Sequence, residues 1–246
     1  MISRFLPVGL GLAAALGAAA ATTNDLSDKE IQGRQLAQQL LLAQRPASNF
    51  TQTGILKIRD AKGGRTEIPI RFQIIVAEPD SLSWSSHYEM TTTNNPARLM
   101  IVHGDGKPNG YRLFEGGGQS DLDRNQTMIP FAGSDFWVAD LGLEFFQWPA
   151  QKLLKKVVRS SRGCSVLEST NPAPATNGYA RVVSWIDSEN GGILHAEAYD
   201  ARGKLLKEYD TRKLKKVDGQ WRVEEMEIEN DQTGSRTRLE FDLKTE

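Results

Sequence analysis

The sequence has little of the chemistry that marks an enzyme or a metal protein. Its 246 residues include one cysteine, Cys164, and three histidines, His87, His103 and His195. A single cysteine forms no internal disulfide and no multi-cysteine metal cluster, and we expect its thiol to be a small buried group. The histidines lack the short spacing of paired metal ligands. Because nucleophile elbows, phosphate loops and dinucleotide glycine patterns are missing too, the sequence favours a binding protein without a cofactor or metal.

Net charge is also nearly absent. The chain has 30 basic and 31 acidic residues, which give a formal net charge of -1. Proteins that bind nucleic acid or anionic membranes through their overall charge are strongly basic. The composition therefore gives no global electrostatic reason to expect either partner.

The one long apolar run stands at the N-terminus and predicts a targeting segment. Arg4 supplies a positive charge, residues 6–16 are mostly apolar, and residues 19–21 are three alanines that suit a cleavage site. We expect a signal peptide over residues 1–21, export to the periplasm, and a single domain over residues 22–246. The alternative is an uncleaved anchor, although the glycine and alanine content makes the run weakly apolar for a spanning helix. No cysteine follows the run, so we do not expect a lipid-anchored lipoprotein.

The remaining chain predicts a mainly β fold with helices. A capping-box pattern, Ser27–Glu30, begins a helix expected over residues 28–44. From there on, apolar and polar residues alternate, most clearly over residues 68–76 and 237–243, with glycine-rich turns between the runs. About ten strands with short connections predict an antiparallel sheet, and a sheet of that width tends to curl. We expect a single curved antiparallel sheet wrapped around helices.

The stretch Ser134–Pro149, SDFWVADLGLEFFQWP, is the most apolar part of this domain. Ser134 and Asp135 are suitable helix caps and Pro149 is a suitable stop, so we predict one continuous helix. Apolar side chains would cover it on most sides, which favours a place inside the curved sheet. Either an ordinary core helix or a lid over a hydrophobic cavity fits. Residues 115–133, rich in glycine and polar side chains, would be a mobile flap or a surface insertion.

A lid of this kind implies a hydrophobic cavity, and large apolar residues are available to line one. A cavity of this kind suits an acyl chain, because each buried methylene contributes about 0.8 kcal/mol. The predicted lipid-binding residues are Phe72, Ile74, Trp84, Tyr88, Met90, Met100, Phe136, Trp137, Leu141, Phe145 and Phe146.

Two stretches resemble a known family. The first is Ser134–Pro149, and the second is Tyr179–Leu243. Within the second, the similar segments are, in order, Ser184–Asp187, Tyr199–Lys204, Asp218–Trp221, Met226–Glu227 and Thr237–Leu239. They resemble the outer-membrane lipoprotein-sorting proteins, the family of the LolA-type periplasmic carriers. The resemblance implies an incomplete β-barrel with a helical lid and a hydrophobic cavity. It further implies a carrier that takes lipoproteins by their acyl chains from an inner-membrane release complex to an outer-membrane acceptor.

Our main hypothesis is therefore a monomeric, non-enzymatic periplasmic carrier of acylated lipoproteins or other envelope lipids, with no nucleic acid partner. A second hypothesis is a structural or assembly factor of the cell envelope whose concave face is filled core. A third is a hydrolase acting on envelope lipid or glycan, which the missing catalytic constellation disfavours.

Overall fold

The computed structural model describes residues 26–77, 83–91, 96–104, 106–217 and 219–243. The predicted signal peptide, residues 1–21, lies outside these ranges. Among the described residues, no helix has the length and apolar character that a membrane crossing requires.

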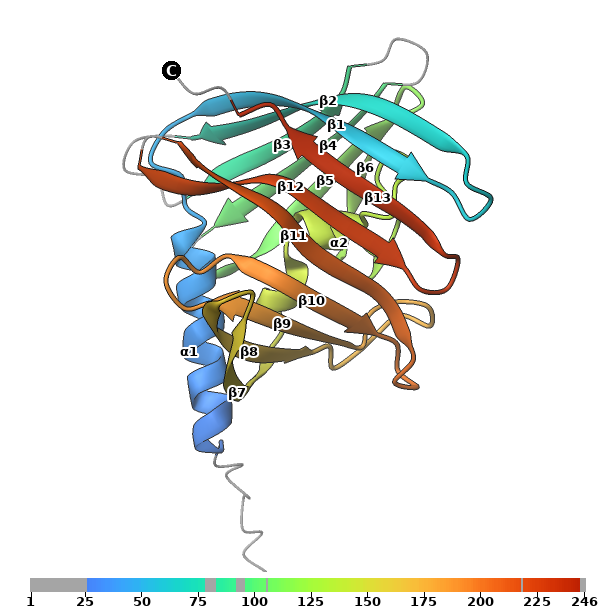
Figure 1. The fold of residues 1–246 in the computed structure, drawn as a ribbon. Coiled ribbons are helices and arrows are strands. Elements are labelled where there is room, and N and C mark those ends of the chain that lie inside the picture. The colour runs from blue at the N-terminus through green and yellow to red at the C-terminus, as the bar shows by residue number, and fades with distance from the viewer. Residues whose placement is uncertain (1–25, 78–82, 92–95, 105, 218, 244–246) are drawn as a thin grey trace, which may run out of the picture.

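One antiparallel sheet of 13 strands forms most of the molecule and curves around its interior (Figure 1). The strand order is β6-β5-β4-β3-β2-β1-β13-β12-β11-β10-β9-β8-β7, so the first and last strands of the chain pair in the middle of the sheet. The two edge strands, β6 and β7, do not pair with each other, so the curved sheet stays open. The predicted mainly β fold with a single curved antiparallel sheet is confirmed.

The strands are β1 (Phe50–Arg59), β2 (Arg65–Val76), β3 (Trp84–Met90), β4 (Ala97–Gly104), β5 (Lys107–Glu115), β6 (Gly118–Leu122), β7 (Ala150–Arg159), β8 (Arg162–Thr170), β9 (Arg181–Asp187), β10 (Ile193–Tyr199), β11 (Leu205–Val217), β12 (Gln220–Asn230) and β13 (Ser235–Phe241). Most strands that follow each other in the chain are joined by short turns, as the sequence predicts, but β6 is joined to β7 through residues 123–149. The turn Asp200–Gly203 is closed by a hydrogen bond from the Gly203 amide to the Asp200 carbonyl, and the positive φ of Gly203 (77°) explains the glycine.

The predicted N-terminal helix is α1 (Asp28–Ala43), and its capping box between Ser27 and Glu30 is present. The helix lies along β7 at one side of the sheet (Figure 1). A close approach makes Gly33 necessary there, because a Cβ atom on Gly33 would lie 2.5 Å from the backbone nitrogen of Lys152. The helix therefore packs backbone to backbone on β7.

The prediction of one continuous helix over Ser134–Pro149 is wrong. The structure has two short pieces, α2 (Val138–Leu141) and the 3-10 helix η2 (Glu144–Gln147). Between them Leu143 adopts a left-handed conformation with φ of 48°, which ends α2 and turns the chain. A Cβ atom on Gly142 would collide with the hydroxyl of Tyr111, so a glycine is required where the chain passes close to β5. We call residues 127–148 the aromatic segment.

The expected flap over residues 115–133 contains more regular structure than predicted. Gly118–Leu122 pairs with β5 as the edge strand β6, and Asp123 caps a short 3-10 helix, η1 (Arg124–Gln126). The side chains of β6 are largely exposed, which agrees with the prediction that this stretch makes no core strand. Exposed polar strands are common at sheet edges.

The aromatic segment lies inside the curve of the sheet and divides the interior into two core clusters (Figure 1). One cluster joins Phe131, Phe136 and Val138 to the inner faces of β1–β5, β12 and β13. The other joins Phe145, Phe146 and Trp148 to α1 and β8–β10. Cys164 on β8 is 1% exposed, as predicted for a buried thiol.

Candidate functional site

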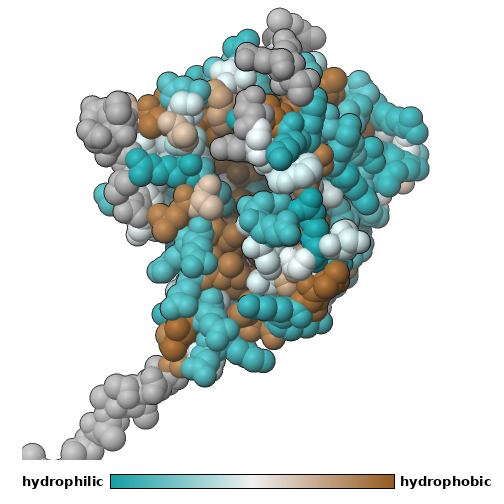
Figure 2. Space-filling model, turned by 60° about the vertical axis from the view of Figure 1, so that its left-hand side comes forward, coloured by the Kyte–Doolittle hydropathy of each residue, from teal (hydrophilic) through white to brown (hydrophobic). Residues whose placement is uncertain are grey.

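A cavity of about 880 Å³ opens between the two core clusters. Its walls come from the inner faces of β1–β3 and β9–β13, from the end of α1, and from the aromatic segment. Most lining side chains are apolar, and Figure 2 shows hydrophobic surface in a hollow beside α1. Small-molecule sites usually have volumes of about 300–1,000 Å³ and mostly apolar walls, so this cavity has the size and character of a binding site for an apolar ligand.

Seven of the eleven predicted lipid-binding residues line this cavity. β2 and β3 supply three of them and the aromatic segment supplies four. They are Phe72, Ile74, Tyr88, Phe136, Leu141, Phe145 and Phe146. Phe72 and Ile74 lie on the inner face because they alternate in step with the core residue Ile70 on β2, and Tyr88 lies there because it is directly opposite Phe72.

The other four residues do not line this cavity. Trp84 stacks on His103 at 3.8 Å between ring centroids and lines a neighbouring pocket of about 640 Å³. Met90 is at the end of β3, beyond the cavity wall. Met100 lies between the core residues Leu99 and Ile101, and it therefore points to the outer face of the sheet. Trp137, the last of the four, stacks on a tyrosine.

The predicted lipid-binding residues include none from the opposite wall of the cavity. It is formed by small and aromatic side chains of β9–β12, namely Val182, Ile193, Ala196, Ala198, Tyr209, Met226 and Ile228. The alternation of these strands gave the signal that could have found them, since every second residue faces inward. Alanines at positions 196 and 198 leave space that larger side chains would fill.

The α2 end of the aromatic segment is fixed to the sheet by a buried lysine. Lys207 on β11 is 2% exposed, and its Nζ donates to the backbone carbonyl of Asp135 at 2.6 Å. The same Nζ lies 3.6 Å from Oδ2 of Asp140 and 3.7 Å from the ring centroid of Trp137. Tyr179 on the segment before β9 stacks on Trp137 and donates its hydroxyl to Asp140 at 3.1 Å. We call these five residues the Lys207 anchor.

Burial sets the protonation chemistry of this anchor. Loss of hydration lowers the pKa of Lys207 to about 8, although Asp140 and Asp135 act in the opposite direction. Burial also raises the pKa of Asp140, against the attraction of Lys207 and the hydrogen bond from the Trp137 amide. Each charge is thus stabilised mainly by the other members of the anchor.

The η2 end is fixed by a second buried cluster. Tyr111 on β5 donates its hydroxyl to Oε2 of Glu144 at 2.7 Å, and Arg124 forms an ion pair with the other oxygen, Nε to Oε1 at 3.0 Å. Asn109 donates to the Gly142 carbonyl at 2.8 Å and accepts from the Gln147 amide at 2.6 Å. We call these six residues the Tyr111 anchor: Asn109, Tyr111, Arg124, Gly142, Glu144 and Gln147.

His103 supports the Tyr111 anchor from β4. Its Nδ1 lies 3.0 Å from Oδ1 of Asn109, and its Nε2 lies 3.0 Å from the hydroxyl of Ser86. Because the Asn109 oxygen only accepts, Nδ1 carries the proton and Nε2 accepts from Ser86. Burial lowers the pKa of His103 to about 4, so the ring is neutral near neutral pH.

The arrangement suits the binding of an apolar ligand. Asp140, Tyr179 and Lys207, which contribute to the cavity wall, bond to one another in the Lys207 anchor, and most of the other lining side chains are apolar. In the part of the chain that the structure describes, no three histidine, cysteine, aspartate or glutamate side chains are grouped to hold a metal ion.

Several solved structures share this fold. A DUF1329 family protein from Desulfovibrio piger is 17% identical, with a TM-score of 0.73 over 88% of this chain and 92% of that one. A putative outer membrane lipoprotein-sorting protein domain from Vibrio parahaemolyticus is 20% identical, with a TM-score of 0.72 over 87% and 92%. A LolA superfamily protein from Nitrosomonas europaea is 16% identical, with a TM-score of 0.59 over 87% and 93%. The TM-scores show that these proteins and this chain have a common fold.

No curated protein matches the sequence. A family model described as "-like: Uncharacterized protein" matches residues 121–244, slightly more than half of the chain. The matched residues run from β6 to the end of β13 and include the whole aromatic segment. The chain therefore belongs to the family that this model describes, and its fold is that of the outer-membrane lipoprotein-sorting domains of the LolA superfamily.

Proposed function

We propose that this protein is a non-enzymatic carrier that binds the acyl chains of lipoproteins, or of another envelope lipid, in the cavity beneath the aromatic segment. The observation that carries the proposal is the apolar cavity of about 880 Å³ on the concave face of a lipoprotein-sorting fold. Residues 1–21 would direct the chain to the periplasm, and residues 22–246 would act there as one monomeric domain. Its partners would be a release complex at the inner membrane and an acceptor at the outer membrane.

The energetics support acyl chains as ligands. Each methylene buried contributes about 0.8 kcal/mol, so a chain of about 15 carbons would contribute on the order of 10 kcal/mol. Binding of that strength is enough to hold a lipid away from a membrane if the cavity is already open or opens at small cost. The two alanines of the β10 wall, Ala196 and Ala198, keep such a space unfilled.

In this proposal the aromatic segment is the lid. It contributes Phe136, Leu141, Phe145 and Phe146 to the cavity wall, and its two anchors hold it to opposite parts of the sheet. An acyl chain would replace contacts between these side chains and the strands, and the segment would move outward to admit it. The lid is thus built from two short helices joined at Gly142 and Leu143.

A matched pair of variants tests the cavity. Ile74 lines it and is 8% exposed, whereas the next residue, Ile75, points to the outer face and is 43% exposed. Ile74→Glu should weaken binding of a fluorescent fatty-acyl probe by at least about tenfold, because a carboxylate is poorly tolerated in an apolar wall. Ile75→Glu, with the same chemical change, should bind within about twofold of wild type.

A steric variant separates loss of binding from loss of folding. Ala196→Phe adds an apolar ring to the cavity wall and should reduce probe binding while circular dichroism shows a folded protein. The rival function, a structural envelope factor with a filled core, predicts no probe binding by wild type. Equal binding by wild type, Ile74→Glu and Ala196→Phe would place the ligand elsewhere and overturn the proposal.

A further inference from the structure

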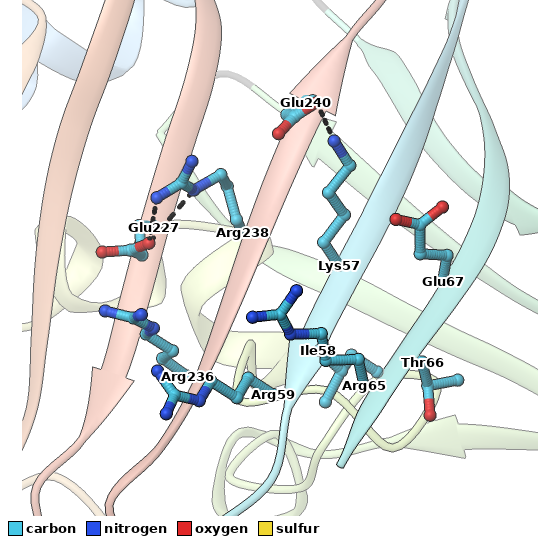
Figure 3. A pocket seen from close by; sticks show the side chains of 10 residues that line it. All are labelled: Lys57, Ile58, Arg59, Arg65, Thr66, Glu67, Glu227, Arg236, Arg238 and Glu240. Carbon is cyan, nitrogen blue, oxygen red and sulfur yellow. Dashed lines mark hydrogen bonds and ion pairs between the residues drawn. The ribbon is translucent and has the colours of Figure 1, made fainter. Parts of the chain in front are cut away.

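Three arginines stand side by side on the outer face of the sheet, on neighbouring strands. Arg59 of β1 is directly opposite Arg65 of β2 and also directly opposite Arg236 of β13. Side chains in such positions have Cβ atoms about 4.5–5.5 Å apart. We call Arg65, Arg59 and Arg236 the arginine row. Figure 3 shows it on the sheet surface together with Lys57 and Arg238.

The row is remote from the acyl cavity. It lies where the β1–β2 and β12–β13 hairpins end, at the side of the sheet away from α1 (Figure 1). Phe50, which lines the cavity, is at the other end of β1. With a rise of about 3.3 Å per residue, the two ends of this strand are roughly 30 Å apart.

Acidic partners neutralise the neighbouring basic residues. Lys57 pairs with Glu240 at 2.6 Å, and Arg238 pairs with Glu227 at 2.9 Å. No described residue forms an ion pair or hydrogen bond with the side chains of the arginine row. The difference singles out three guanidinium groups that form no ion pair with any described residue, although Glu67 and Glu229 lie near them.

The nearest acidic residues do not supply that counter-charge. Asp60 follows Arg59 in the chain, but its Oδ1 accepts from the amides of Lys62 and Gly64, both at 2.8 Å, and closes the turn. Glu229 stands opposite Arg236 on β12 and is exposed without forming an ion pair. Arg59, in the middle of the row, has an arginine on either side.

Like charges directly opposite each other destabilise a sheet. The arginine row therefore costs stability in the free protein, and a bound anion would remove that cost. The groove containing the row has a volume of about 320 Å³, and its five basic and three acidic side chains give it a charge of +2. Guanidinium groups bind phosphate through paired, charge-assisted hydrogen bonds, which makes phosphate oxygens the best match.

We propose that the arginine row is a binding site for a phosphate-bearing anion, separate from the acyl cavity. The anion has two possible sources with the same chemistry, a small soluble phosphate compound or the headgroup of a phospholipid at a membrane surface. In the second case the row docks the far end of the sheet onto the membrane. The site is local, so it is compatible with the nearly neutral charge of the whole chain.

The test compares the full chain with two triple variants. Arg59→Gln/Arg65→Gln/Arg236→Gln removes the row. Lys155→Gln/Lys156→Gln/Lys204→Gln is the matched control, because it removes the same charge from three exposed lysines elsewhere. One arm titrates pyrophosphate by calorimetry at an ionic strength matched with sodium chloride. The other arm measures co-sedimentation with phosphatidylcholine vesicles that contain or lack phosphatidylglycerol.

We expect wild type and the lysine control to bind within about twofold of each other in at least one arm, and the arginine variant to bind at least about tenfold more weakly. Binding of pyrophosphate identifies a soluble ligand, and binding only to phosphatidylglycerol vesicles identifies a headgroup. The arginine variant should unfold at a temperature no lower than wild type, and Ile74→Glu should bind the anion normally. The proposal is overturned if wild type binds neither probe, if the arginine variant retains binding, or if the lysine control loses as much.

Discussion

The two anchors of the aromatic segment do the same task with different chemistry. The Lys207 anchor joins α2 to β11 through a buried ammonium group, a carboxylate and two aromatic rings. The Tyr111 anchor joins η2 to β4 and β5 through a tyrosine hydroxyl, an asparagine and a neutral histidine. Apolar contacts alone would let the segment slide over the sheet, whereas these directional bonds fix its position at both ends. The anchors should therefore differ in how strongly, and at which pH, they release the segment.

The largest effect is expected in the Lys207 anchor. Lys207→Met fills a similar volume but leaves Asp140 as a buried carboxylate without its cation. Removing one partner of a buried ion pair typically costs about 3–5 kcal/mol, so we expect a loss of about 3 kcal/mol of unfolding free energy in chemical denaturation. The double variant Lys207→Met/Asp140→Asn should recover part of that loss. A Lys207→Met protein as stable as wild type would show that the anchor does not hold the segment.

Acid should weaken the Tyr111 anchor through His103. The pKa of this histidine is about 4 in the folded protein, below its ordinary value of 6.5, so the unfolded chain binds its proton first as the pH falls. Stability linked to His103 is complete above pH 6.5 and decreases toward pH 4, by as much as about 3 kcal/mol.

The measurement is urea unfolding of wild type and His103→Gln across that pH window. The wild-type curve should fall more steeply than that of the variant, because only wild type has the buried imidazole. Trp84 stacks on His103, so its fluorescence in the folded protein should change only as the pH approaches about 4, where the ring takes up its proton. Parallel pH curves for the two proteins would contradict the role given to this ring.

Removal of the Tyr111 hydroxyl tests how much the Tyr111 anchor contributes to stability. Tyr111→Phe keeps the ring and removes the hydrogen bond to Glu144, which remains buried beside Arg124. Hydrogen bonds to charged groups contribute about 1.5–3 kcal/mol, so we expect a loss of about 2 kcal/mol, less than for Lys207→Met. As a control, Tyr199→Phe alters a tyrosine on the outer side of β10 and should leave acyl-probe binding unchanged. A larger loss from Tyr111→Phe than from Lys207→Met would reverse the ranking of the anchors.

The smallest effect is expected at alkaline pH, in the Lys207 anchor. The pKa of Lys207 is about 8 in the folded protein, against 10.5 ordinarily, so between these values only the unfolded chain keeps the proton. Stability linked to this lysine therefore rises with pH, by about 1 kcal/mol between about pH 7 and about pH 9. The difference between wild type and Lys207→Met in unfolding free energy should shift by that amount in favour of wild type. A shift of opposite sign would mean that the attraction of Asp140 and Asp135 for the charged lysine exceeds the cost of burying that charge.

Much of the fold follows from local patterns in the sequence. The capping box Ser27–Glu30 specifies the start of α1, and alternation over residues 68–76 and 237–243 specifies β2 and β13. The aromatic segment was predicted wrongly because the spacing of its apolar residues imitates a helix. The left-handed Leu143 interrupts the helix, and the adjoining Gly142 packs against Tyr111, more than 30 residues away, which no local pattern contains.

The candidate site was predicted less completely than the fold. Met100 was assigned to the wrong face because residues 99–102 are all apolar, and without alternation neither face is marked. No sequence pattern marks Lys207, Asp140 and Glu144 as buried, since only the tertiary fold brings each of them into the interior. The arginine row could not be predicted from the sequence for a related reason. Its members are distant in sequence, and the strand register alone brings them side by side.

The most direct test of the central claim is native mass spectrometry of the protein purified from the periplasm. If the protein is a carrier, its mass should include an increment that corresponds to an acylated species. Ala196→Phe should lose this increment, and Ile75→Glu should retain it. A wild-type protein that is always recovered without lipid, and that takes up no acyl chain when one is offered, would contradict the carrier function.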